Sequence, residues 1–115
     1  MNRLILALLC AGVFHAATAA GPLPEWLHYY QMAAERGSAK GQYQLGALYT
    51  RSPQVKNPAK GYQWLTIAAK TIGAGNVSGI TADQATTLRA LAAMGMTKDE
   101  VAAAEAAAAA FKAKQ

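Results

Sequence analysis

Cysteine and histidine are scarce in this 115-residue chain, which has one cysteine, Cys10, and two histidines, His15 and His28. Cys10 and His15 fall within the first twenty residues, a segment that we expect to be removed from the protein. The remaining chain then has no thiol for a disulfide or for nucleophilic catalysis. With one histidine and scattered acids, it also lacks a typical set of zinc ligands. We therefore predict no metal, no cofactor and no enzymatic activity.

Acidic residues are also few, six against 11 lysines and arginines. Removing Arg3 with the first segment leaves a modest and scattered positive excess, whereas chains that bind nucleic acid concentrate their cations. Four of the acids lie where helices are expected to begin, and the helix dipole explains them: Glu25, Asp83, Asp99 and Glu100. The charge pattern predicts neither a paired-carboxylate hydrolase nor a nucleic-acid partner.

Long apolar runs are absent apart from one near the N-terminus, Leu4 to Phe14. Arg3 precedes this run and small residues at positions 17–19 follow it, which is the pattern of a secretory signal peptide. The run is too short to span a bilayer, which needs roughly 20 residues. We predict that residues 1–20 are a signal peptide, cleaved after Ala19 or Ala20. The protein would then be exported to the periplasm or out of the cell, without a stable membrane anchor.

Strand alternation is not evident, whereas apolar residues recur at helical spacing from residue 21 onward. A leader and a first helix are predicted for residues 21–37, with recurring apolar positions on one face. A helical hairpin is predicted for residues 38–73. Its first helix covers residues 39–49, and its second begins at Asn57-Pro58, a capping residue followed by proline at the first helical position.

The last part of the chain, residues 74–115, is predicted to hold a flexible glycine-rich loop and two capping helices. Each helix opens with a capping box, from Thr81 to Gln84 and from Thr97 to Glu100. Leu88 and Leu91 are expected on the buried side of the first of these helices. The second helix is rich in alanine, and its inner stripe is expected at Val101, Ala104, Ala108 and Phe111.

Two segments about 35 residues apart resemble each other, Tyr29–Ala34 and Trp64–Ala69, since both run from an aromatic residue to a pair of alanines. Such a period is typical of arrays in which each helical hairpin packs on its neighbour. Glycine within a helix is unfavourable by up to about 1 kcal/mol, so a glycine in the 39–49 helix predicts a closely packed neighbour. We expect five residues to build this packing: Leu45, Gly46, Tyr49, Trp64 and Ala68.

The same region carries a longer pattern, which comprises Ala39, Gln42-Tyr43, Leu45-Gly46, Leu48-Tyr49, Val55, Ala59-Lys60, Trp64-Leu65 and Ala68-Ala69. This pattern resembles the Sel-one-like repeat (SLR), a relative of the tetratricopeptide repeat (TPR). Residues 29–37 are similar to the closing half of a preceding repeat, and residues 91–111 resemble the C-terminal cap of bacterial members. The resemblance implies an all-α fold, a short right-handed solenoid of antiparallel helical hairpins with about five helices. It also implies protein–protein contacts and brings no catalytic motif.

One candidate contact face lies on the 39–49 helix, because the first helix of each hairpin usually lines the concave face of such arrays. Leu45 and Tyr49 are expected to point into the hairpin. The outward positions are then Lys40, Tyr43 or Gln44, Ala47 and Arg51. Cations around an aromatic residue suit an acidic or amphipathic protein segment, and a solvated helix face is the alternative interpretation.

A second candidate contact site consists of Trp26 and Tyr30 on the first helix, which has no preceding repeat to cover it. The site would serve a protein partner or another copy of the chain as a homo-oligomer. We therefore expect a non-enzymatic module that mediates protein–protein interaction in the bacterial envelope or outside the cell. The alternative is a small envelope effector that acts directly, as an enzyme inhibitor or on a membrane surface.

Overall fold

Helix α2 (Glu25–Glu35) is the first element of the described residues and begins directly after Pro24. The computed structural model describes residues 24–115, and the expected signal peptide lies outside this range. Leu27 and Ala34 are fully buried, and Tyr30 packs against the same cluster. The buried side of α2 therefore runs through Leu27. Tyr29 is exposed and lies outside this buried side.

A tight corner joins α2 to α3 (Ala39–Arg51). Gly37 adopts a φ of 96°, a left-handed conformation that favours glycine. The next residue, Ser38, caps α3, because its side chain accepts a hydrogen bond from the N–H of Gly41 at 3.1 Å. The buried Gln42 then ties the helices together by donating from Nε2 to the carbonyl of Ala34 at 3.2 Å.

Helices α3 and α4 (Pro58–Ile72) pack through glycines on both sides of their contact. A Cβ atom on Gly46 would lie 2.6 Å from Cγ of Leu65. On Gly61 it would overlap the Thr50 side chain, which donates to the carbonyl of Gly46 at 2.7 Å. The prediction of a closely packed neighbour at Gly46 is therefore confirmed. Thr50 fills the space that the absent side chain of Gly61 leaves.

The glycine-rich segment after α4 contains a short hairpin, which corrects the prediction of a loop without strands. Strands β1 (Asn76–Val77) and β2 (Ile80–Thr81) pair antiparallel, with Val77 opposite Ile80. Ser78 and Gly79 connect them with φ values of 52° and 80°. Strands of two residues are too short to show an alternating pattern in the sequence.

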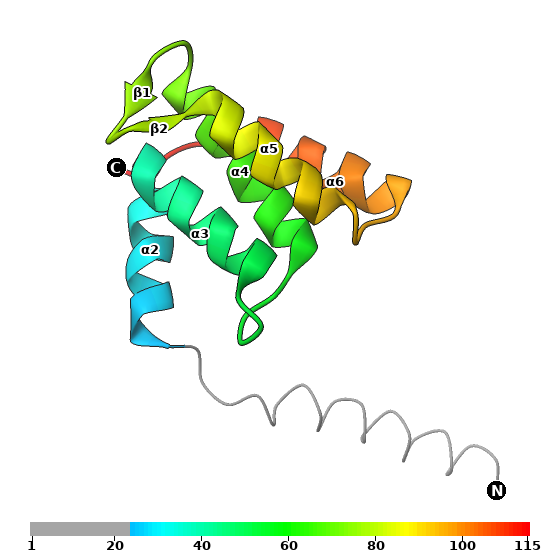
Figure 1. The fold of residues 1–115 in the computed structure, drawn as a ribbon. Helices are drawn as coiled ribbons and strands as arrows, with labels where there is room; N and C mark the ends of the chain where they lie inside the picture. Colours follow the sequence, from blue (N-terminus) through cyan, green and yellow to red (C-terminus); the bar gives the residue numbers. More distant parts are fainter. Residues whose placement is uncertain (1–23) are drawn as a thin grey trace, which may run out of the picture.

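Helices α5 (Ala82–Ala93) and α6 (Lys98–Ala110) both begin with the predicted capping boxes. Helix α5 lies over α3 and α4, and α6 lies behind α4 in Figure 1. The buried residues of α5 include Leu88, whereas Leu91 is 48% exposed. The prediction that Leu91 is buried is therefore wrong, because the contact of α5 follows Ala85, Leu88 and Ala92.

The C-terminal tail, residues 111–115, leaves α6 and returns to the corner between α2 and α3 (Figure 1). Phe111 contacts Trp64 edge to face, with ring centroids 5.4 Å apart. The N–H of Lys114 donates to the carbonyl of Glu35 at 2.8 Å, and its Nζ lies 3.2 Å from the Glu35 carboxylate. The tail thus connects α4 with the end of α2.

The core of the described residues forms three clusters, and α4 contributes to each of them with residues between Tyr62 and Ala69. Leu45, Tyr49 and Ala68 are buried in it, whereas Trp64 is only partly buried beside them. Trp64 was predicted to be buried in the packing, and it is only partly buried there, with the Phe111 ring in edge-to-face contact. The predicted all-α fold class is confirmed for residues 24–115, with the two-residue strands as a small addition.

Candidate functional site

The open side of α2 carries three large apolar side chains that remain exposed. Trp26 is 40% exposed, Tyr29 69% and Met32 39%. Their spacing of three residues places them along one side of the helix, and together with Glu25 and His28 they line a shallow hollow. We call Trp26, Tyr29 and Met32 the α2 ridge. Large apolar side chains that gather in one place mark a contact site more often than scattered ones do.

The packing of α2 explains why the ridge stays uncovered. The opposite side of the helix holds Leu27 and Ala34, which turn toward α3. Among residues 24–115, α3 is the one helix or strand that packs extensively on α2. The Tyr29 ring contacts its neighbour Tyr30 edge to face at 5.5 Å, while Tyr30 itself is partly buried. Of the two predicted contact residues of this helix, Trp26 is thus the exposed one.

A second hollow of about 230 Å³ lies between α2 and the first turn of α3. The two helices approach closely there, since a Cβ on Gly41 would lie 2.8 Å from Cβ of Ala33. Lys40 reaches this hollow from α3, and the rings of Tyr29 and Tyr30 reach it from α2. The predicted contact residues Lys40 and Tyr30 therefore meet here, although the sequence assigned them to separate faces.

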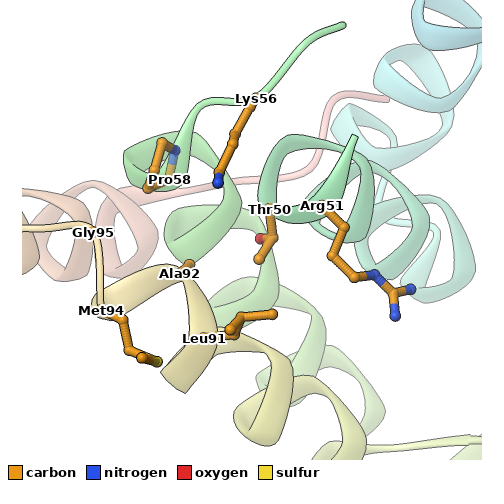
Figure 2. A pocket seen from close by; sticks show the side chains of 8 residues that line it. All are labelled: Thr50, Arg51, Lys56, Pro58, Leu91, Ala92, Met94 and Gly95. Atoms are coloured by element: carbon orange, nitrogen blue, oxygen red, sulfur yellow. The ribbon is translucent and has the colours of Figure 1, made fainter. Parts of the chain in front are cut away.

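A larger pocket of about 420 Å³ forms where three helix ends converge, and we call it the end pocket (Figure 2). The end of α3, the α3–α4 loop and the start of α4 supply one side of it, and the end of α5 supplies the other. Its apolar wall includes Leu91 and Met94, which are 48% and 82% exposed. The complete lining is Thr50, Arg51, Lys56, Pro58, Leu91, Ala92, Met94 and Gly95.

Two cations stand at the rim of the end pocket, Arg51 and Lys56, and both are exposed. Figure 2 shows the ammonium group of Lys56 directed toward Pro58 and the pocket, and the guanidinium group of Arg51 directed outward. The pocket thus combines an apolar wall with an excess of positive charge. Sequence reasoning found Arg51 but missed Lys56 and Met94, because a loop residue and a residue after a helix end carry no periodic signal.

The predicted single contact face on α3 is wrong, because α5 packs across its middle. Ala47 is only 6% exposed and lies in a cluster with Leu65 and Leu88. Tyr43 is partly buried against the same cluster. Lys40 and Arg51 remain exposed, but each lines a different hollow at its own end of α3. The alternative position Gln44 is partly buried and lines neither hollow.

Several acids of the described chain already have partners of their own. Hydrogen bonds from Lys114 and then Gln31 hold the pKa of Glu35 below its ordinary value of 4.5. Glu105 accepts a hydrogen bond from the hydroxyl of Tyr62 at 3.1 Å. Burial, reinforced by this bond, raises the pKa of Tyr62. Glu100 belongs to the capping box of α6. None of the six acids in residues 24–115 lines the end pocket.

Within the part of the chain that the structure describes, no three histidine, cysteine or acidic residues gather as they would around a metal ion. No helix of that part has the length and apolarity needed to cross a membrane. Comparison of the chain with protein-family models, with curated proteins and with solved structures gives no match.

Proposed function

We propose that this protein is an exported, non-enzymatic helical-repeat module that binds another protein through the α2 ridge. The observation that carries the proposal is the joint exposure of Trp26, Tyr29 and Met32 on one side of a helix whose other side is packed. Aromatic residues and methionine are enriched in protein–protein interfaces, and tryptophan and tyrosine are enriched among the residues that dominate binding energy.

The proposal includes the finer architecture, a short right-handed solenoid of the Sel-one-like repeat type. Three observations support it: the glycine-mediated approach of α3 to α4, the tight corner at Gly37, and the burial of Gln42 and Leu45 at positions of the repeat pattern. In such arrays each layer is covered by the next one. Among residues 24–115, α3 alone packs extensively on α2, so the α2 ridge is the surface on which another protein would continue the packing.

Site-specific photocrosslinking tests this function. A photoreactive phenylalanine analogue replaces Tyr29 in the full chain, which is produced in a bacterium and irradiated in the intact envelope. We expect a discrete crosslinked protein that mass spectrometry identifies. The same analogue at the exposed Ala107 of α6 should give no such product. Trp26→Ala in the Tyr29-labelled chain should abolish the crosslink, and a crosslink of equal yield from Ala107 would count against the α2 ridge.

Export is proposed together with binding and needs its own measurement. Intact-mass analysis of the protein recovered from the periplasm or medium should show loss of the first 19 or 20 residues. Retention of Met1 in a cytoplasmic product would overturn this part of the proposal. Such a result would not contradict the binding proposal, because the α2 ridge lies outside the first 20 residues.

The alternative of a small effector that acts on a membrane surface is tested on the same protein. Tryptophan and tyrosine also gather at membrane interfaces, so the α2 ridge by itself does not distinguish a lipid from a protein partner. Co-sedimentation with anionic vesicles should leave the protein in the supernatant if its partner is a protein. Sedimentation that Trp26→Ala abolishes would favour the membrane function instead.

A further inference from the structure

The end pocket offers a second binding site, separate from the α2 ridge, with which it shares no lining residue. It also differs from the ridge in chemistry. The ridge carries two aromatic rings, whereas the lining of the end pocket contains no aromatic residue. Its large apolar side chains are Leu91 and Met94, and its charged side chains are both cationic.

The apolar wall of the pocket is exposed in a way that the leucines of the core are not. Leu45 and Leu65 are 0% exposed, whereas Leu91 is 48% exposed. Ala92 and Thr50 are buried residues of the lining, and we call them the floor of the pocket. The Thr50 hydroxyl already donates to the carbonyl of Gly46. An occupant would therefore contact an apolar wall and a floor whose hydroxyl group already donates its hydrogen bond. The polar groups of the occupant would then be recognised by the cations at the rim.

The charge at the rim is not balanced by the acids of the described chain. Lys114–Glu35 is the one ion pair within residues 24–115. Arg51 and Lys56 stand beside a pocket that no carboxylate lines. A carboxylate on the occupant would supply the opposite charge, and partial removal from water would strengthen that contact. The exposed side chain of Arg51 can rotate toward such a group, while Lys56 already faces the pocket.

We propose that the end pocket binds a short segment of a partner protein in which a large apolar side chain stands next to a carboxylate. The volume of about 420 Å³ lies within the range of known binding pockets, and a flexible methionine at the wall adapts to side chains of different shape. A nucleic acid fits less well, because the pocket has no aromatic face for base stacking. The proposal rests on the proposed function only in taking the occupant to be a protein.

Binding of a defined peptide tests the site. The probe is a fluorescein-labelled peptide, acetylated and amidated at its ends, in which leucine alternates with glutamate. One control peptide has glutamine in place of every glutamate, and a second has serine in place of every leucine. We expect fluorescence anisotropy to show the probe binding about tenfold more tightly than either control. Added salt should weaken the binding of the probe. Equal binding of the glutamine peptide would overturn the proposal.

Variants of the full chain locate the bound peptide. Lys56→Glu alone should weaken probe binding, and Lys56→Glu with Arg51→Glu should weaken it by about tenfold or more. Met94→Ser should weaken it as well. Lys70→Glu is the matched control, since Lys70 is exposed on α4 but does not line the pocket. Thermal melts verify that each variant folds. If Lys70→Glu weakens binding as much as Lys56→Glu does, the peptide responds to net charge and the site is wrong.

Two further arms separate this inference from the proposed function. Trp26→Ala removes part of the α2 ridge and should leave probe binding unchanged, whereas it should abolish the crosslink from Tyr29. Loss of the crosslink with retained peptide binding supports both sites, whereas loss of both would place the peptide on the α2 ridge and overturn only the end pocket. Vesicles that contain phosphatidylglycerol form the last arm. Vesicle binding that depends on Lys56, without binding of the peptide, would assign the pocket to lipid and overturn the proposal.

Discussion

Helix α4 meets its neighbours in two different ways, α3 on one side and α6 with the C-terminal tail on the other (Figure 1). Against α3, glycines bring the backbones together and Leu65 is fully buried beside Gly46. Against α6, the buried residues of that helix are alanines, Ala104 and Ala108. Because buried leucine removes far more apolar area from water than alanine does, the two contacts differ in their source of stability.

The contact with α6 is held instead by single interactions along its length. The Tyr62 hydroxyl donates to Glu105, and Phe111 of the tail packs on Trp64. Lys114 then fixes the tail to Glu35 at the end of α2. Shape complementarity therefore stabilises the packing of α3 against α4, whereas a few side-chain contacts hold α6 and the tail in place. Changes at the first contact should unfold the protein, and changes at the second should release only one part of it.

The largest effect is expected from Leu65→Ala in the contact between α3 and α4. The side chain is 0% exposed and faces Gly46, so its truncation leaves a cavity between closely spaced backbones. We expect the free energy of unfolding to fall by about 2–5 kcal/mol. Urea denaturation measures the change. Leu91→Ala is the matched control at a half-exposed leucine of α5, and a loss of equal size there would contradict the comparison.

A smaller effect is expected from Gly46→Leu, which adds volume to the same contact. Even the first carbon of the new side chain would overlap Leu65, at 2.6 Å from its Cγ. Overpacking of this kind lowers the free energy of unfolding by about 1–3 kcal/mol. The control is Gly75→Leu, where a Cβ meets nothing within 4 Å. A melting temperature that Gly46→Leu leaves at the wild-type value would show that α3 and α4 are not closely packed there.

The contact with α6 is tested by Phe111→Ala, with an expected loss of about 1–2 kcal/mol. Aromatic pairs contribute about 0.5–1.5 kcal/mol beyond their buried area, and the Trp64 ring also loses its cover. Hydrogen exchange should show faster exchange in α6 and unchanged protection in α3 and α4. Lys112→Ala, at an exposed tail residue, is the control. Equal loss of protection in α3 would mean that the two contacts are not independent.

The sequence predicted the helices well because their ends carry local signals. Ser38, Asn57, Thr81 and Thr97 cap helices through bonds to backbone groups a few residues away, and those bonds depend little on the rest of the fold. Gly46 indicated a close helix contact for a related reason. A glycine within a helix lowers helix stability, and close packing of a neighbour explains its presence there. These local signals predicted where the helices begin and where α3 approaches α4.

The sequence did not predict which side chains face solvent, because that depends on where distant helices pack. Ala47 was expected outside and is buried, since α5 crosses α3 there. Leu91 was expected inside and is exposed, because the contact of α5 is built mainly from alanines. Alanine fits both faces of a helix equally well, so an alanine-rich sequence weakens the periodic signal. Both binding surfaces depend on which side chains the distant helices leave exposed. The sequence therefore did not identify Tyr29, Lys56 and Met94 as contact residues.

The smallest expected effect belongs to the ion pair that fixes the tail, and it depends on pH. The hydrogen bond from Lys114, with that from Gln31, lowers the pKa of Glu35 below 4.5 in the folded protein. The carboxylate therefore stabilises the fold at neutral pH, and this contribution is lost as the pH falls below 4.5 through the lowered pKa. Because the lysine side chain is 71% exposed, solvent screening keeps the contribution below about 1 kcal/mol.

Glu35→Gln should accordingly reduce the free energy of unfolding slightly at pH 7 and leave it unchanged well below the lowered pKa, where both side chains are neutral. Urea denaturation of both proteins across this pH range measures the difference, which high salt should diminish at pH 7. The backbone bond from the Lys114 N–H to the Glu35 carbonyl remains in both proteins. In a Lys114→Gln background most of the difference should disappear, since the first cause of the pKa shift is removed. A difference that persists unchanged there would show that Glu35 acts through Gln31, and that the tail is held by its backbone bond and Phe111 alone.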